Sequence, residues 1–409
     1  MARSKLWSYE NALVLTMCLT NGVVTLDRLA VNYLSPYIVG EFHLSNTQLG
    51  LLASVLSVAI AGSGYLLASL ADATHQRKRI LVTMLALFSL CSALSGLATR
   101  FGFLLIARSI LGLAEGPVAP IAQSITAIES SEHRRGLNLG IMLNLGAAVI
   151  GIGLGPILAT RLAAAFGWRS AFFVSGIPGL LLALAIGLFL RPLRNAPAAS
   201  AKTSKPTGPG LLSLLRSRNM ILCILISGLY SAWLLVQSVF LPLYLVRTDG
   251  LSPTSMGLVV SVTGISVAVG GMGVPALSDR IGRRPALLIA TLFGVLAPLA
   301  TLLVHGPAPM IAVALLVGYL GGGAGPLYVG VIPTESAPAR QAATAVAISL
   351  ASGELIGGVA APILAGKAAD LFGPAAPFWI SAGCAAACGI LSLFLIETAP
   401  RKLRATATA

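Results

Sequence analysis

Five ionisable residues interrupt segments that are otherwise almost free of charge. They are Asp27, Arg28, Arg108, Glu115 and Glu354. A charge at the centre of a membrane-spanning segment costs about 2.5–3.5 kcal/mol on insertion scales, so such residues mark substrate pathways and proton relays by default. Carboxylates there take up and release protons, and guanidinium groups bind carboxylates or phosphates. We expect the chemistry of this chain to occur at these five positions.

The spacing of Arg108 and Glu115 predicts that they work together. They are seven residues apart, which is two helical turns, so they project from nearly the same face about 10 Å apart. A proton on Asp27 or Glu115 would then depend on whether a solute occupies the arginines, which couples proton flow to solute flow. The alternative is an ion-pair set that only fixes the helices. The spacing leaves open whether Arg108 pairs with Asp27, Glu115 or Glu354.

The composition predicts the elements that hold these residues. Hydrophobic residues make up 56% of the 409 residues and charged residues 10%. The apolar residues come in blocks of about 20 or more, the length that crosses a hydrocarbon core about 30 Å thick. We therefore predict an all-α integral membrane protein with twelve transmembrane helices. They are expected at about 11–36, 46–71, 80–98, 102–128, 136–161, 168–190, 219–246, 253–274, 285–304, 308–332, 340–366 and 376–396.

The basic residues predict the topology. The net charge of +14 comes from 27 Lys and Arg against 13 Asp and Glu. Basic residues concentrate in every second loop, as in cytoplasmic loops, so they indicate a membrane protein and not a nucleic-acid partner. We expect a multi-pass protein of the bacterial inner membrane with both termini in the cytoplasm. The predicted parts are an N-terminal six-helix bundle (1–190), a cytoplasmic linker (191–218), a C-terminal six-helix bundle (219–400) and a cytoplasmic tail (401–409).

The two predicted bundles repeat one another. The segment Pro156-Ile157-Leu158-Ala159 reappears as Pro362-Ile363-Leu364-Ala365, at a separation of 206 positions. The same separation relates Phe172 to Phe378, Ser175 to Ser381, Glu129 to Glu335 and Arg134 to Arg340. Parallel six-helix repeats of this kind build a midplane binding site between two bundles.

Two loops carry a family signature. The segment from Pro275 to Arg284 reads PALSDRIGRR and resembles the major facilitator signature G-x-L-A-D-R-x-G-R-[KR], with Pro in place of the first Gly. The segment from Ala68 to Arg79 keeps the Asp and a basic cluster but lacks both glycines. The resemblance implies a major facilitator fold in which these loops lock helix ends. The gating residues it implies are Asp72, Arg77, Asp279, Arg280, Arg283 and Arg284.

The buried charges resemble those of the anion:cation symporter family. Asp27-Arg28 matches its Asp-Arg pair in the first helix, and Arg108 to Pro120 matches its pattern R-x6-E-[GA]-x3-P. The resemblance implies that Asp27 and Glu115 carry protons while Arg28 and Arg108 bind or sense a carboxylate. Spinster-type lipid transporters share the Asp-Arg pair and the R-x6-E spacing. Glu354 departs from the anion-transporter pattern, and it is expected to be a second proton site, a cation contact or a partner for an arginine.

One face of the seventh predicted helix carries Tyr230, Trp233, Gln237 and Tyr244. We expect Tyr230, Trp233 and Gln237, together with Glu354, to form part of the substrate-binding wall, because binding sites combine apolar surface with a few polar groups. The alternative is that these side chains pack against other helices or lipid.

Motifs for other chemistry are missing from the sequence. It contains no Walker G-x4-G-K-[ST], and its four histidines fall in predicted loops without a metal-ligand cluster. We therefore expect no enzyme activity, no cofactor and no metal. The five cysteines are expected to be small buried hydrophobic residues.

The predicted function is proton-coupled symport of a small organic anion across the lipid bilayer, by a monomer that works through alternating access. The first rival is proton-driven efflux of amphipathic compounds or lipids, which Glu354 favours and the arginines disfavour. The second rival is a membrane receptor that does not transport.

Overall fold

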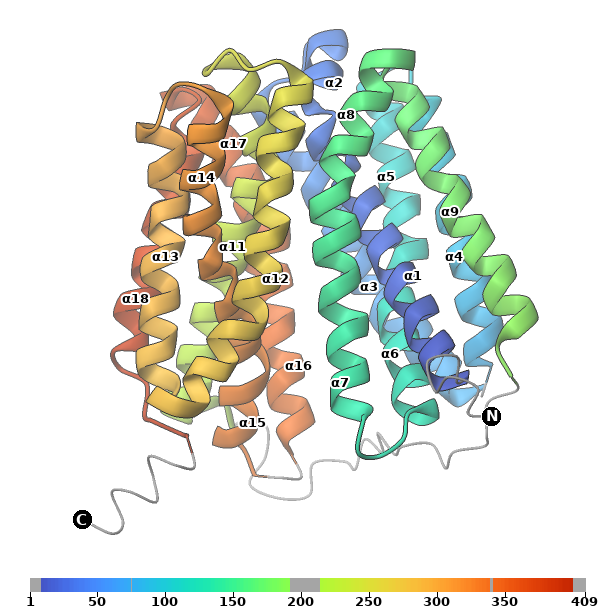
Figure 1. Cartoon of the computed structure of the whole chain (residues 1–409), viewed down its shortest axis with the longest axis vertical. Coiled ribbons are helices and arrows are strands. Elements are labelled where there is room, and N and C mark those ends of the chain that lie inside the picture. The colour runs from blue at the N-terminus through green and yellow to red at the C-terminus, as the bar shows by residue number, and fades with distance from the viewer. Residues whose placement is uncertain (1–8, 75, 192–213, 339–340, 400–409) are drawn as a thin grey trace, which may run out of the picture. The chain divides into compact units, whose positions relative to one another are not determined.

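The computed structural model describes residues 9–74, 76–191, 214–338 and 341–399. Every regular element in these ranges is helical (Figure 1). Eleven helices are long and apolar enough to cross a membrane, and Ala376–Ser392 is a shorter apolar helix. The predicted all-helical, membrane-spanning architecture is confirmed. Most of the expected linker (191–218) and all of the expected tail (401–409) lie outside the described residues.

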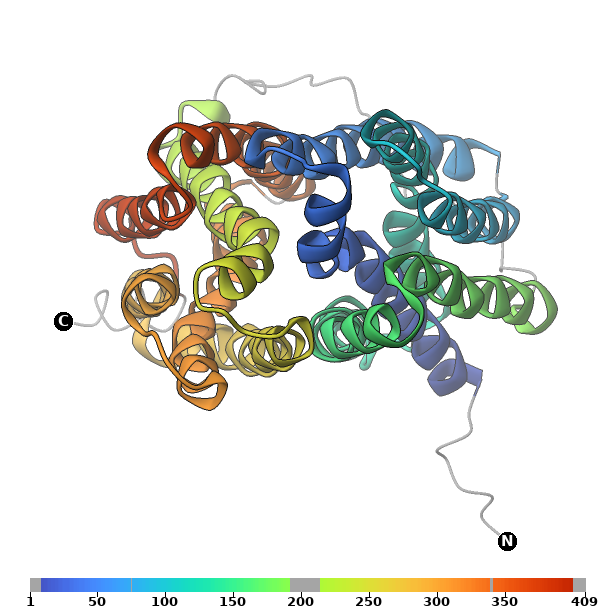
Figure 2. The same cartoon turned by 90° about the horizontal axis from the view of Figure 1, so that it is seen from above.

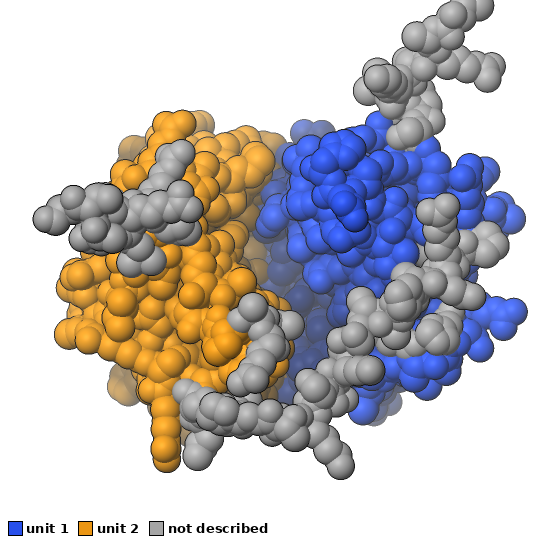
Figure 3. Space-filling view, turned by 90° about the horizontal axis from the view of Figure 1, so that it is seen from below, with its two compact units in different colours: residues 1–43, 55–202 blue, residues 44–54, 203–409 orange. Residues whose placement is uncertain are grey.

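The chain divides into two compact units (Figure 3). Unit 1 comprises Met1–His43 and Val55–Lys202, and unit 2 comprises Leu44–Ser54 and Thr203–Ala409. The first turns of one helix are therefore grouped with unit 2, although the rest of that helix belongs to unit 1.

The helices of unit 1 include several spans built from more than one piece. They are α1 (Tyr9–Tyr33), α2 (Ser35–Phe42), α3 (Asn46–Ala73, whose first turns count with unit 2), α4 (Arg77–Gly96), α5 (Phe101–Glu115), α6 (Val118–Glu129), α7 (Arg135–Gly140), η2 (Ile141–Leu145), η3 (Ala147–Leu154), α8 (Gly155–Phe166) and α9 (Trp168–Phe189). Figure 2 shows many of them nearly end-on.

Unit 2 is built in the same way. Its helices are α11 (Arg218–Arg247), α12 (Pro253–Ile281), α13 (Arg283–Leu303), α14 (Ala308–Tyr319), η4 (Leu320–Ala324), η5 (Leu327–Val331), α15 (Ile332–Ser336), α16 (Ala342–Ser352), η7 (Gly353–Ala360), α17 (Ala361–Phe372) and α18 (Ala376–Ser392).

The internal repeat extends to irregular local structure. The π-helical segments η3 and η7 occupy equivalent positions, each followed by an α-helix of twelve residues. Gly167 (φ 82°) and Gly373 (φ 92°) end these helices in the same left-handed conformation. Since π-helical turns are rare and frequently occur at functional sites, their recurrence marks the same point of each unit as a candidate functional segment.

Three predicted helix ends fall several residues too early. The spans expected to end at 161 and 366 continue to Phe166 and Phe372. The segment after residue 274 was expected to be a loop, but α12 continues to Ile281, so Asp279 and Arg280 lie on its last turn. The 29 residues of α12 span about 43 Å, and apolar character is needed only over the hydrocarbon core of about 30 Å. The helix stops at Gly282, whose φ of 109° is accessible to glycine and rarely to other residues.

Close backbone contact positions α1 inside unit 1. A side chain at Gly146 would place its Cβ 2.0 Å from the carbonyl oxygen of Cys18, so only glycine lets the span at residues 135–166 approach α1 this closely. A side chain at Gly22 would likewise meet the carbonyl of Gly146 at 2.7 Å. Small residues permit such approach between helices in lipid. Asp27 lies five residues beyond Gly22 on the same helix, so this packing sets the position of Asp27 within unit 1.

Candidate functional site

Four charged side chains of unit 1 form two ion pairs between two helices. Asp27 and Arg28 come from α1, and Arg108 and Glu115 come from α5. Arg108 Nη1 lies 4.0 Å from Asp27 Oδ2, and Arg28 Nε lies 3.9 Å from Glu115 Oε1. In this structure the partner of Arg108 is therefore Asp27, which answers the question that the spacing left open.

The guanidinium of Arg108 also holds the backbone of α1. Its Nη1 donates to the carbonyl of Asp27 at 3.3 Å, and its Nη2 donates to the carbonyl of Arg28 at 2.7 Å. A helix normally uses these carbonyls for its own hydrogen bonds. The Arg108 guanidinium binds them in addition, and it thereby fixes the local geometry of α1. With 1% of its surface exposed, Arg108 is a buried link between α1 and α5.

The carboxylate of Asp27 is held by two serine hydroxyls that the sequence analysis missed. Ser92 on α4 and Ser175 on α9 both donate to Oδ1, Ser175 at 2.7 Å. The repeat was the available signal, because Ser175 pairs with Ser381, and the Ser381 hydroxyl donates at 3.2 Å to the carbonyl of Trp233, the residue equivalent to Asp27. The equivalent serine thus donates to a carboxylate side chain in unit 1 and to a backbone carbonyl in unit 2.

One oxygen of Asp27 remains without a hydrogen bond among the described residues. Oδ2 is buried and faces Arg108, whose Nε is also without a hydrogen-bond partner in this part of the chain. Buried polar atoms in native structures nearly always have partners, and exceptions often mark catalytic or ligand sites or an unseen water. Oδ2 is therefore the oxygen of Asp27 whose hydrogen-bonding capacity is unused among the described residues.

The second pair is more accessible than the first. The Arg28 side chain is 27% exposed, whereas the Glu115 side chain is 5% exposed. Glu115 is the last residue of α5, where Gly116 and Pro117 interrupt the span before α6. A Cβ at Gly116 would lie 2.2 Å from the Ser63 hydroxyl of α3, so glycine allows α3 and α5 to touch beside Glu115. Arg28 is the most exposed member of the set.

The aromatic residues expected to line a pocket are buried inside unit 2. Trp233 is 0% exposed, and its indole N–H donates to the carbonyl of Gly294 at 2.8 Å. The Tyr230 hydroxyl donates to the carbonyl of Gly321 at 2.8 Å, and its ring centroid lies 4.9 Å from those of Trp233 and Tyr328. These contacts tie α11 to α13, η4 and η5, which suits a supporting layer better than an exposed wall.

Gln237 and Glu354 remain candidates of a different kind. The Gln237 side chain is fully buried on α11, and neither its nitrogen nor its oxygen has a hydrogen-bond partner among the described residues. Glu354 lies in the first turn of η7, in the π-helical part of its span, and is partly exposed. Both belong to unit 2, whereas the Asp27 and Glu115 pairs belong to unit 1.

Two of the predicted gating residues of unit 2, Asp279 and Arg283, belong to a charge cluster centred on Arg283. Its Nη1 lies 2.6 Å from Asp279, and its Nη2 lies 2.8 Å from Glu335, a residue that the sequence analysis did not assign to the gate. Nη1 also donates to the hydroxyl of Ser278 at 2.7 Å. In the sequence, Glu335 could have been singled out because the repeat places it opposite Glu129, 206 positions earlier.

The remaining gating candidates have different surroundings. Arg280 and Arg284 are exposed, and the backbone N–H of Arg284 donates to Glu397 Oε2 at 3.2 Å. In unit 1, Arg77 is buried at the start of α4, and the side chain of Asp72 lies outside the described part of the structure. The charge cluster is thus described in detail only for unit 2.

The sequence matches one protein family over most of its length. The model of the Major Facilitator Superfamily matches residues 17–358. The chain is 28% identical to a hexuronate transporter of Bacillus subtilis, covering 69% of this chain and 67% of the relative. It is also 28% identical to a 3-(3-hydroxy-phenyl)propionate transporter of Escherichia coli, covering 84% of this chain and 83% of the relative.

A solved structure shares the fold. A bacterial homologue of the human lysosomal transporter Spinster, in an inward-facing and unoccupied conformation, superposes with a TM-score of 0.72 at 20% identity. The match covers 96% of this chain and 95% of the other.

Proposed function

Since the chain belongs to the Major Facilitator Superfamily and is a multi-pass membrane transporter, we propose that it carries a small organic anion together with protons, by alternating access. The observation that supports this proposal best is the pair of ion pairs Asp27–Arg108 and Arg28–Glu115. Each joins a carboxylate that can be protonated to a guanidinium that can bind an anion, so the two events compete for the same groups.

In the proposed cycle the anion binds first at Arg28. The Arg28 side chain is the most exposed of the four, and a guanidinium binds a carboxylate with two parallel hydrogen bonds. When Arg28 turns to the substrate, its positive charge no longer favours the ionised form of Glu115 at this nearly buried position. A buried carboxylate that loses a nearby positive charge is protonated more readily, so substrate binding draws in a proton.

Asp27 is the proposed second proton carrier, and Arg108 positions it. Ser92 and Ser175 occupy Oδ1, and a proton on Oδ2 would weaken the attraction to Arg108. Arg108 would then hold α1 only through the carbonyls of Asp27 and Arg28. Loss of one side-chain contact between α1 and α5 is a local event that can bias an equilibrium between two conformations of the unit.

The relatives support the anionic substrate class. Hexuronate and 3-(3-hydroxy-phenyl)propionate are both carboxylates, as their names state, so an organic acid is the substrate class that we propose for this chain. In unit 2 we propose that Gln237 and Glu354 contact the polar groups that distinguish one acid from another, and that Tyr230 and Trp233 support Gln237 from within the bundle.

The proposed topology follows from the basic loops. We propose that both termini and the Arg283 cluster lie in the cytoplasm, that the membrane is a bacterial inner membrane, and that the transporter works as a monomer. Asp279, Arg283 and Glu335 would lock the cytoplasmic ends of α12 and α15 in one state of the cycle, with Arg280 and Arg284 at the rim. Asp72 and Arg77 are proposed as the counterpart in unit 1.

The replacement Arg108→Ala tests the site assignment. We expect binding of an organic acid to the detergent-purified protein to be lost, and because removal of one member of a buried ion pair costs about 3–5 kcal/mol, we also expect a lower unfolding temperature. Circular dichroism verifies that the variant is folded. Arg161→Ala, at an exposed position of α8, is the matched control. Unchanged transport by Arg108→Ala would refute the assignment.

A further inference from the structure

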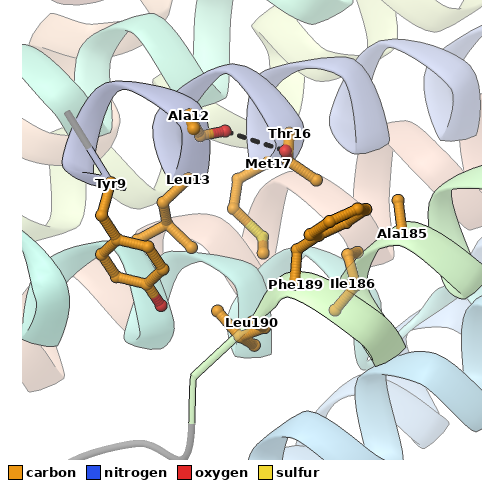
Figure 4. Close-up of a pocket in the computed structure, with 9 residues that line it drawn as sticks. All are labelled: Tyr9, Ala12, Leu13, Thr16, Met17, Ala185, Ile186, Phe189 and Leu190. Atoms are coloured by element: carbon orange, nitrogen blue, oxygen red, sulfur yellow. Dashed lines mark hydrogen bonds between the residues drawn. The ribbon is translucent and has the colours of Figure 1, made fainter. Parts of the chain in front are cut away.

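An apolar groove lies at one end of unit 1, away from the charged site. It lies between the first turns of α1 and the last turn of α9, and its cavity volume is about 80 Å³ (Figure 4). Tyr9, Leu13 and Met17 line it from α1, and Ile186 and Phe189 line it from α9. None of these residues takes part in the ion pairs described above, so the groove has no place in the proposed transport step.

The lining of the groove suits hydrocarbon. Apart from Tyr9, Thr16 is the only lining residue with a hydroxyl group. This hydroxyl donates to the carbonyl of Ala12 at 2.8 Å within the same helix (Figure 4). Phe189 at the edge of the groove is 77% exposed, as is usual for a side chain that faces lipid. A concave apolar surface on a membrane-spanning helix pair is filled most favourably by an acyl chain.

Two cations stand at the end of the groove where α9 stops. Lys78 Nζ donates to the carbonyl of Leu190 at 2.5 Å, and the Arg191 guanidinium lies 4.4 Å from the ring centroid of Tyr9. Both cations are thus anchored on residues that line the groove. Neither forms an ion pair with a carboxylate among the described residues, so their charge is available to an anionic ligand.

We propose that this groove is a binding site for an anionic phospholipid, with an acyl chain between α1 and α9 and the headgroup phosphate at Arg191 and Lys78. Long basic side chains at the ends of membrane helices reach the headgroup region, and basic pockets between such helices bind acidic headgroups. Charge complementarity selects an anionic headgroup over a zwitterionic one. The volume of the groove accepts a segment of one chain and not a whole lipid.

The site has a consequence for the transporter. The lipid would bridge the start of α1 and the end of α9, and the same two helices carry Asp27 and Ser175 of the charged site. The inference itself depends only on the membrane-spanning fold, and it holds whether the transported solute is an anion or not. The lipid site and the transport of an anion can therefore be tested independently, and a negative result for one does not contradict the other.

Native mass spectrometry of the full-length protein in detergent tests the site, with phosphatidylglycerol and phosphatidylcholine of identical acyl chains as probes. We expect phosphatidylglycerol to stay bound when phosphatidylcholine is lost. Arg191→Gln should weaken its binding by about fivefold, the effect of one cation at a membrane surface. Arg135→Gln, an exposed arginine outside the groove, is the matched control and should change little.

A second pair of variants tests the groove itself. Ala185→Phe fills it without a change in charge and should displace the lipid, whereas Leu184→Phe, on an exposed position of the same helix outside the groove, should not. Equal retention of the two lipids, equal losses in Arg191→Gln and Arg135→Gln, or bound lipid in Ala185→Phe would each overturn the proposal. Displacement of phosphatidylglycerol by inorganic phosphate would do so as well, because it would show a site for free anions.

Discussion

Arg108 binds Asp27 at two points, through its carboxylate at 4.0 Å and its backbone carbonyl at 3.3 Å. A guanidinium that holds both the side chain and the backbone of the same acidic residue links the charge of that residue to the shape of its helix. Protonation of Asp27 would remove the first contact and leave the second. The proposed coupling of protons to movement begins with this difference.

The replacement Asp27→Asn separates accumulation from exchange. The amide mimics a protonated carboxylate in size and keeps an oxygen that accepts from Ser92 and Ser175. We expect the variant to exchange labelled for unlabelled organic acid across liposome membranes but not to accumulate it. With one proton per anion, a gradient of one pH unit, about 1.4 kcal/mol, drives up to about tenfold accumulation in the wild type. Gradient-driven accumulation by Asp27→Asn would contradict the role of Asp27.

Much of the fold could be predicted because a bilayer imposes it. Apolar length determines where a chain crosses the membrane, so most expected spans agree with the helices within a few residues, and the major facilitator resemblance of the segment from Pro275 to Arg284 is confirmed by the family match. The repeat was visible because equivalent helices need equivalent small residues and prolines, as at Pro156 and Pro362. The π-helical form of η3 and η7 was not visible, because it depends on packing and not on composition.

The pairing of the charged residues could not be predicted, because it depends on how helices lie against one another. The same α5 face can offer Arg108 to Asp27 or keep it near Glu115, and the choice depends on where α1 lies in the folded unit. Ser92 carried no signal as a single serine in an apolar helix, and Ser175 could be noticed only through its repeat partner Ser381. Trp233 was expected at a pocket wall, yet its hydrogen bond to Gly294 is formed by residues 61 positions apart, which no local pattern reveals.

The two adjacent arginines of the α13 start should differ sharply. Arg283 binds Asp279, Ser278 and Glu335, whereas the Arg284 side chain is exposed. Hydrogen bonds to charged groups contribute about 1.5–3 kcal/mol each, so Arg283→Gln should lower the unfolding temperature by several degrees and slow transport. Arg284→Gln should do neither to a comparable extent. Thermal unfolding followed by tryptophan fluorescence makes the comparison, and equal effects would contradict the gating cluster.

Glu397 should make stability depend on pH. Burial acts to raise its pKa, but hydrogen bonds from the backbone N–H groups of Arg283, Ala399, Arg284 and Thr398 hold the pKa below its ordinary value. A carboxyl group whose pKa is lowered by folding stabilises the protein above the unfolded-state pKa of about 4.3, and this stabilisation is lost as the pH falls through the folded-state pKa.

Glu397→Gln tests this dependence. The variant should unfold at a lower temperature than the wild type at pH 7, because the charged acceptor at the start of α13 is gone. The difference should shrink as the pH falls through the lowered folded-state pKa of Glu397, below which the wild-type carboxyl group is protonated as well. A difference that stays the same at both pH values would show that the charge of Glu397 has no role.

Uptake by proteoliposomes tests the central claim most directly. The wild type, Glu115→Gln and Glu354→Gln would be compared under an imposed pH gradient, with hexuronate, 3-(3-hydroxy-phenyl)propionate and a lipophilic cation as substrates. We predict that an organic acid accumulates in the wild type, that Glu115→Gln abolishes its accumulation, and that Glu354→Gln only alters the choice among acids. Transport of the cation that needs Glu354 but not Glu115 would contradict anion symport and identify a proton-driven exporter.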